Sequence, residues 1–145
     1  MTTRLSNASQ QGAADSVVDR IDTGTTTAEG MIRIYTGAQP ADADDAATGI
    51  LLVEILLANP AYGAANTSGT AALLSTPRSA TAVAAGIAGW FRMITRDSAT
   101  VYDGAARAAA DNDTGQELVL DNTDIAAGQT VIVTALTYTQ PANEV

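Results

Sequence analysis

The chain of 145 residues contains no cysteine, no histidine and no lysine, so its seven basic residues are all arginine. Without cysteine it has no disulfides, no thiolate metal sites and no cysteine nucleophile. Without histidine it lacks the commonest metal ligand and the commonest general base. Without lysine it has neither a Schiff-base amine nor the ammonium group of a Walker-type phosphate loop. We therefore expect a structural or binding protein with no enzymatic activity and no cofactor.

Sixteen acidic residues outweigh the seven arginines and give a net charge of −9 at pH 7. Such an acid excess argues against binding to nucleic acid phosphates. The longest strongly apolar run, 50–58, is interrupted by Glu54 and falls short of the roughly 18 residues of a membrane helix. The opening MTTRLSNASQQ lacks the apolar segment of a signal peptide. We expect a soluble protein made in a cytoplasm, without a membrane partner.

Small residues dominate the composition, with 30 alanines and 20 threonines against one tryptophan, one phenylalanine and four tyrosines. The core must therefore consist mainly of valine, isoleucine, leucine and closely packed alanine. Such a core buries less apolar area per residue than an aromatic one, so partners are expected to add stability.

An N-terminal helix is predicted over residues 1–22, because its apolar residues recur near a 3.6-residue period. Thr2, Thr3 or Ser6 is suited to cap it, and Gly12 weakens its interior. The threonine-rich stretch after residue 22 is typical of a linker. A helix this short needs a surface to pack on. We predict a helical arm and linker over residues 1–28 and a β-domain over residues 29–145.

After residue 30 the apolar period changes to two and turn residues become frequent, which is typical of strands. A β-hairpin with its turn at 96–99 is the clearest element, 105–110 is expected to be a loop or a helical turn, and 64–85 is expected to hold one or two weak strands. Further strands are predicted at 31–36, 50–57, 117–120 and 130–139. The sequence thus predicts a mainly β fold, an antiparallel β-sandwich or jelly-roll-like barrel with an N-terminal α-helix.

Two acidic stretches are candidate cation sites. Asp42, Asp44 and Asp45 share one loop, and Asp111–Glu117 resembles the first half of a calcium loop. The bidentate acid that such a loop needs at its twelfth position is Asn122 here. We expect both stretches to form turns rather than metal sites.

Trp90 and Phe91 are adjacent in a predicted strand, so they point to opposite faces. One is expected in the core, and the other is a candidate interface anchor. Arg92 and Arg96 share the face of Trp90. An ordinary exposed strand face is expected for them, and the alternative is that they pair with acids across the strands or with an acidic partner. A hydrolase that uses Glu54 or Glu117 is the least favoured alternative, because glycosidases also need aromatic platforms.

Several segments, in this order and spacing, resemble a group of small tailed-phage and prophage proteins. The segments are IRIYTGAQP at 32–40, ATGILL at 47–52, NPAYG at 59–63, AGIAGWFR at 85–92 and IAAGQTVIV at 125–133. The resemblance spans most of the chain and implies a virion structural protein made in the bacterial host cytoplasm. It implies no catalytic residues and does not separate head from tail.

The leading hypothesis is a capsid decoration or cement protein on the outer surface of the capsid shell. Its partner would be the major capsid protein, and a homo-oligomer, with a trimer favoured, is expected. The alternatives are a tail, neck or baseplate subunit, and a carbohydrate- or receptor-binding module on the virion surface. The candidate partner-binding residues are Leu5, Val17, Val18 and Ile21 of the helix, and Trp90 and Arg92 of the hairpin.

Overall fold

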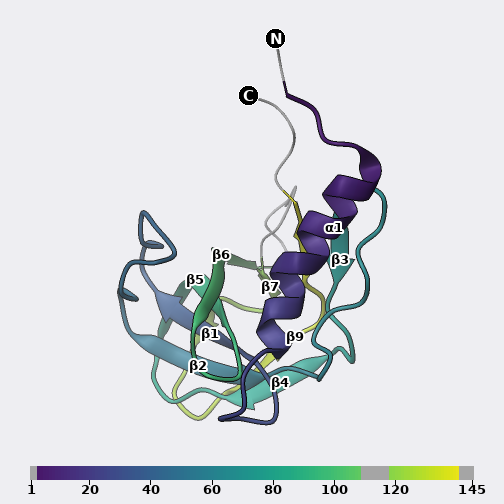
Figure 1. Ribbon diagram of the computed structural model, residues 1–145. Helices are drawn as coiled ribbons and strands as arrows, with labels where there is room; N and C mark the ends of the chain where they lie inside the picture. The colour runs from purple at the N-terminus through teal and green to yellow at the C-terminus, as the bar shows by residue number, and fades with distance from the viewer. Residues whose placement is uncertain (1–2, 109–117, 141–145) are drawn as a thin grey trace.

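The computed structural model describes residues 3–108 and 118–140, and within them the fold is mainly β with one N-terminal helix, as predicted. Helix α1 is Asn7–Val18, and a 3-10 turn, η1, follows at Asp19–Asp22. Figure 1 shows α1 lying against one side of the strands. The strands are β1 (Met31–Thr36), β2 (Leu51–Leu56), β3 (Thr70–Ala72), β4 (Arg78–Thr81), β5 (Gly86–Ile94), β6 (Thr100–Ala108), β7 (Leu118–Leu120), β8 (Asp124–Ile125), β9 (Thr130–Val133) and β10 (Thr137–Thr139).

The main sheet curls into a nearly closed barrel. Its strand order is β2-β1-β5-β6-β7-β9-β4, and β8 pairs with β5. The first and last strands, β2 and β4, are joined by Arg78, whose Nε and Nη2 donate to the carbonyl oxygens of Leu56 and Leu57 at 2.9 and 3.0 Å. The backbone amide of Val83 also donates to the carbonyl oxygen of Leu52 at 2.8 Å. The expected barrel is therefore present, although the β6–β7 pair is parallel rather than antiparallel.

Alternation along the strands fills the barrel interior with aliphatic side chains. Ile32 and Ile34 on β1 face inward together with Phe91 and Met93 on β5, and all four are completely buried. The register places Ile32 opposite Ile55 on β2. Period-two patterning in the sequence thus identifies the inner wall of the barrel.

Three tyrosines complete the interior: Tyr62 and Tyr138 are buried, and Tyr102 is partly buried against the core. The hydroxyls of Tyr62 and Tyr102 lie 2.8 Å apart, and the ring centres of Tyr102 and Tyr138 are 5.1 Å apart. Phe91 meets the Tyr102 ring edge-on. Burial raises the pKa of Tyr62 and of Tyr102 above the ordinary value, because desolvation penalises the phenolate.

A two-stranded sheet, β3–β10, supports the helix (Figure 1). Ala14, Val18 and Ile21 are fully buried and belong to the same core as the barrel strands. Asp15 and Asp22 also accept hydrogen bonds from backbone amides of the β2–β3 connection, at 2.7 and 3.0 Å. Residues of the predicted helical arm 1–28 and of the predicted β-domain therefore share one core.

The helix begins later than the longest predicted version, because Ser6 caps it by accepting a hydrogen bond from the amide of Ser9. Two other expectations need correction. The predicted loop at 105–110 is strand β6 as far as Ala108, and its last two residues lie outside the described part. The predicted strand 130–139 is broken at 134–136, because β9 pairs with β4 whereas β10 pairs with β3.

Two variants test whether the N-terminal helical segment belongs to the core, one at a buried residue and one at an exposed residue. Ile21→Ala removes a completely buried side chain and should lower the free energy of unfolding by about 2–5 kcal/mol. Leu5→Ala alters an exposed residue and should change it by no more than about 0.5 kcal/mol. Urea denaturation measures both, and equal effects would contradict the shared core.

The buried tyrosines predict sensitivity to alkali. Their folded pKa values are raised, so as the pH increases above about 10 the unfolded chain loses its phenol protons first. The free energy of unfolding should be independent of these groups below pH 10 and fall above it. Urea denaturation across this range should show a shallower fall for the double variant Tyr62→Phe/Tyr102→Phe, in which both hydroxyls are removed together. An unchanged slope would contradict this assignment.

Candidate functional site

The outer face of β1, β5 and β6 carries a second buried cluster, separate from the core. Tyr35, Trp90, Arg92 and Asp103 alternate with the inward-facing residues of the same strands. The Tyr35 and Trp90 rings stack with centres 4.6 Å apart, and the Arg92 guanidinium lies 5.3 Å from the centre of the Trp90 ring. This arrangement combines aromatic stacking with a cation–π contact.

Arg92 is held by a two-point ion pair across the hairpin. Its Nε and Nη2 donate to the two carboxylate oxygens of Asp103 at 2.7 and 2.8 Å. The two side chains are only 8% and 2% exposed. The hydrogen bond to Asp103 is the main cause that raises the pKa of Arg92, and the charge of Asp45 adds to it. A charge held in this way is already neutralised within the chain.

The burial of Trp90 and Arg92 corrects their predicted role as partner-binding residues. Trp90 is 0% exposed, so it has no surface to offer as an interface anchor. Its indole Nε1 has no hydrogen-bond acceptor among the described residues. The predicted cross-strand pairing of Arg92 with an acid is confirmed, whereas the ordinary exposed strand face expected for it is not.

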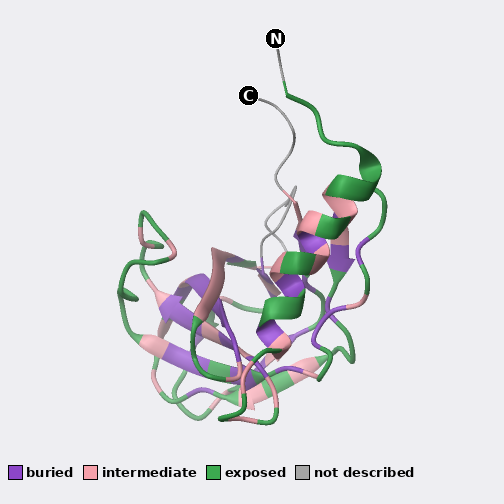
Figure 2. Ribbon diagram, in the orientation of Figure 1, coloured by how far each residue is buried: buried purple, intermediate pink, exposed green. Residues whose placement is uncertain are grey.

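The helix residues proposed as contacts divide into two groups. Val18 and Ile21 are completely buried, which excludes them from a partner surface in this conformation, and Val17 is half-buried against the core. Leu5 is 42% exposed. It belongs to the exposed segment 3–9, here called the N-terminal arm, which stands clear of the barrel in Figures 1 and 2.

Three exposed apolar residues were missed in the sequence. Ile50, Val83 and Ile87 are 57%, 71% and 66% exposed. Ile50 belongs to a run that predicts a buried strand, and the other two belong to stretches rich in alanine. The sequence offered one sign that these residues are exposed at a contact surface, namely the absence of charged residues around them. That absence is equally typical of segments buried in a core.

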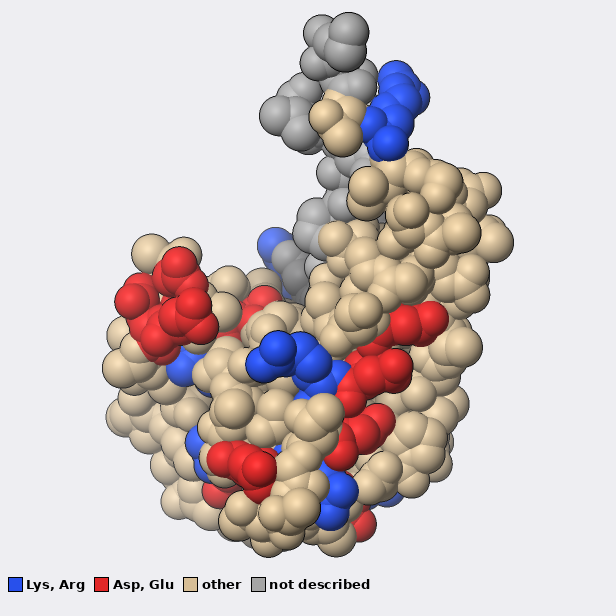
Figure 3. Space-filling model, viewed as in Figure 1, with Lys and Arg blue, Asp and Glu red and all other residues tan. Residues whose placement is uncertain are grey.

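Of the two candidate cation sites, one lies within the described residues. Asp42 accepts a hydrogen bond from the backbone amide of Asp44, so this stretch forms the predicted turn. Acidic side chains gather on the surface there, as Figure 3 shows. Asp111–Glu117 lies outside the described residues. Within residues 3–108 and 118–140, no three acidic side chains come together as a metal-binding group.

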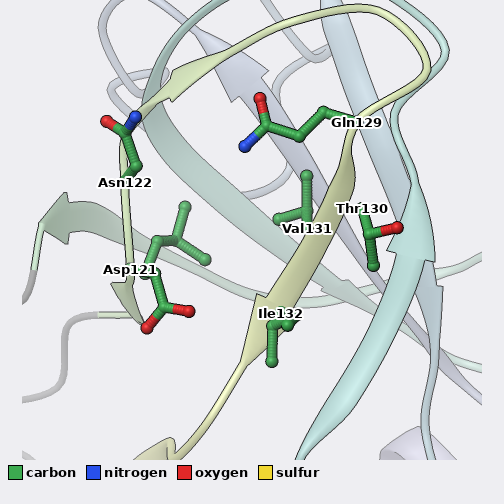
Figure 4. Close-up of a pocket in the computed structure, with 7 residues that line it drawn as sticks. Asp121, Asn122, Gln129, Thr130, Val131 and Ile132 are labelled. Atoms are coloured by element: carbon green, nitrogen blue, oxygen red, sulfur yellow. The ribbon is translucent and has the colours of Figure 1, made fainter.

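A pocket between β7 and β9 has a volume of about 80 Å³ (Figure 4). Asp121 and Asn122 lie on one side of it, and Gln129 and Thr130 on the other. The amide oxygens of Asn122 and Gln129 already accept backbone hydrogen bonds within their own turns. Pockets for small molecules are usually about 300–1,000 Å³, so this one is too small to indicate an organic ligand.

No helix in the described ranges has the length and apolarity needed to cross a membrane. No protein-family model matches the chain, and no curated protein and no solved structure matches it. The N-terminal arm is therefore the feature from which function is inferred.

The buried Arg92–Asp103 ion pair should contribute far more to the free energy of unfolding than the exposed Arg33–Glu54 pair. Asp103→Asn leaves the Arg92 guanidinium buried without a counter-charge and should cost about 3–5 kcal/mol of unfolding free energy. Glu54→Gln breaks the exposed pair with Arg33, where the two side chains are 41% and 29% exposed, and should cost less than about 1 kcal/mol. Urea denaturation compares the two variants. A loss for Asp103→Asn as small as that for Glu54→Gln would refute the buried role.

Proposed function

We propose that this chain is a non-enzymatic phage virion structural protein, a capsid decoration or cement protein that binds the outer surface of the capsid shell. The proposal starts from the resemblance of the sequence segments to small tailed-phage proteins. It is supported by the N-terminal arm, which is exposed while the rest of the helix is anchored. The arm is the observation that carries the proposed mode of binding.

The arm presents chemistry that differs from the rest of the surface. Arg4 and Leu5 place a positive charge beside an exposed apolar side chain, on a chain with a net charge of −9. Ala14 and Val18 fix α1 to the core, so the arm leaves the body from a defined position.

The partner in this proposal is the major capsid protein. A short arm that contacts a neighbouring shell subunit gains affinity from apolar burial, and the acidic body keeps the free protein soluble before assembly. A homotrimer on the shell is part of the proposal. No role in membranes or in nucleic acid binding is included.

The location is tested by immunogold labelling of virions purified from the bacterial strain that encodes the chain. Gold over the heads is the expected result. Gold along or below the tail would contradict the proposal and favour a tail, neck or baseplate subunit. Intact virions without gold would also contradict a place on the outer surface.

The arm is tested with a matched pair of leucines. Leu5→Glu should reduce co-sedimentation with capsids that lack the protein by at least tenfold, because it removes the exposed apolar contact and reverses the local charge. Leu74→Glu, at a leucine that is 37% exposed elsewhere, should bind as the wild type does. Circular dichroism verifies that both variants fold. Full binding by Leu5→Glu would refute the role of the arm.

A further inference from the structure

Strands β7 and β9 are neighbours in the main sheet, but they separate after a single contact. Their register joins them only at Leu120 and Val133. On its other side, β9 pairs with β4 along all four of its residues. Residues 130–132 therefore have no register partner on the β7 side within the described part of the chain. The pocket of Figure 4 occupies the space where the two strands diverge.

The pocket combines buried apolar residues with an exposed polar margin. Leu120 and Val131 line it and are buried, whereas Asp121, Asn122 and Thr130 line it and are exposed. A cavity needs about 10–15 Å³ to hold one water molecule, so it has room for a group of a few heavy atoms. It is therefore suited to one group of a longer molecule rather than to a free organic ligand.

Two side-chain amides flank the pocket, and backbone contacts fix the orientation of both. Oε1 of Gln129 accepts a hydrogen bond from the amide of Ala126, and Oδ1 of Asn122 accepts one from the amide of Asp124, each at 2.9 Å. Only an oxygen accepts from an N–H group, so the other end of each side chain is an NH2 donor. Figure 4 shows the Gln129 side chain extending from the start of β9 toward the side of the pocket where Asn122 lies.

Acceptor groups lie beside these donors. Asp121 contributes a carboxylate, which accepts hydrogen bonds, and Thr130 contributes a hydroxyl, which accepts and donates them. The matching ligand is a group that both accepts and donates within a few ångströms. A peptide group does so through its carbonyl oxygen and its N–H. A sugar hydroxyl does so as well, but it has no backbone that continues the pairing of a strand.

We propose that this pocket binds one peptide group of an extended segment from a partner protein. The segment lies along the start of β9, on the side where residues 130–132 have no register partner. Addition of an extended peptide to an open strand edge is a general mode of recognition, in which backbone hydrogen bonds supply the affinity. The Gln129 amide donates to the carbonyl oxygen of the bound peptide group, and Asp121 accepts from its N–H.

This inference goes beyond the proposed function and does not rest on it. It concerns the binding of peptide by one pocket, whichever protein supplies the segment. The N-terminal arm lies outside the pocket, so failure of capsid binding and failure of peptide binding are separate results.

The test is a titration of the isotope-labelled full chain with trialanine that carries acetyl and methylamide caps, followed by NMR. The signals of the Gln129 side-chain NH2 group and of the backbone N–H groups of residues 130–132 should shift and reach saturation. A dissociation constant of roughly 1 mM is expected for so short a peptide. Methyl glucoside at the same concentrations should leave these signals unchanged.

Two isosteric variants test the donor. Gln129→Glu keeps the oxygen that accepts from Ala126 but replaces the NH2 group with a second oxygen, so it should weaken peptide binding at least tenfold. Gln140→Glu makes the same change outside the pocket, at a side chain whose Oε1 accepts from the Tyr138 hydroxyl. It should bind the peptide as the wild type does.

Circular dichroism establishes that both variants fold. Pocket signals of the wild type that do not move with the capped peptide would overturn the proposal. Full peptide binding by Gln129→Glu, or an equal loss in the two variants, would also overturn it. If methyl glucoside shifts the same signals as strongly as the peptide does, the pocket recognises hydroxyl groups and the assignment to peptide is wrong.

Discussion

The barrel is closed by one side chain rather than by a full ladder of backbone hydrogen bonds. Arg78 on β4 reaches the last carbonyl oxygens of β2, and few backbone bonds join these two strands. The interior consists of apolar side chains, so it excludes water only while the wall stays continuous. A guanidinium group suits this position, because its planar array of donors reaches two carbonyl oxygens at once. The inner core, the tyrosine cluster and the helix contact all depend on that closure.

Local sequence patterns predict those strands and helices that have one apolar face and one polar face. Strand β1 and the β5–β6 hairpin were expected from alternation and from the turn at 96–99, and Ser6 was one of the expected caps. Short strands such as β3 and β4 were weakly indicated, because alanine and threonine do not distinguish an inner face from an outer one. Nothing in the local sequence marks the break at 134–136. Apolar and polar residues continue to alternate there, although β9 and β10 belong to different sheets.

The candidate site was harder to predict, because a local sequence pattern does not show which residues of other elements a side chain will contact. The burial of Arg92 depends on the register that places it opposite Asp103 on the neighbouring strand. Val18 and Ile21 fit a helix face, but the period does not say whether that face meets the chain's own core or a partner. The structure assigns these groups to internal contacts, whereas Leu5, also predicted as a contact residue, is exposed.

The pairing of β3 with β10 also sets an order of events during synthesis. Residues 70–72 leave the ribosome long before residues 137–139, so β3 has no pairing strand until residues 137–139 have emerged. Helix α1 packs on both strands and cannot complete its contacts earlier. The platform that orients the arm therefore cannot form before β10 is available. Chains that stop short of residue 137 therefore lack the supported arm and are excluded from any assembly that depends on it.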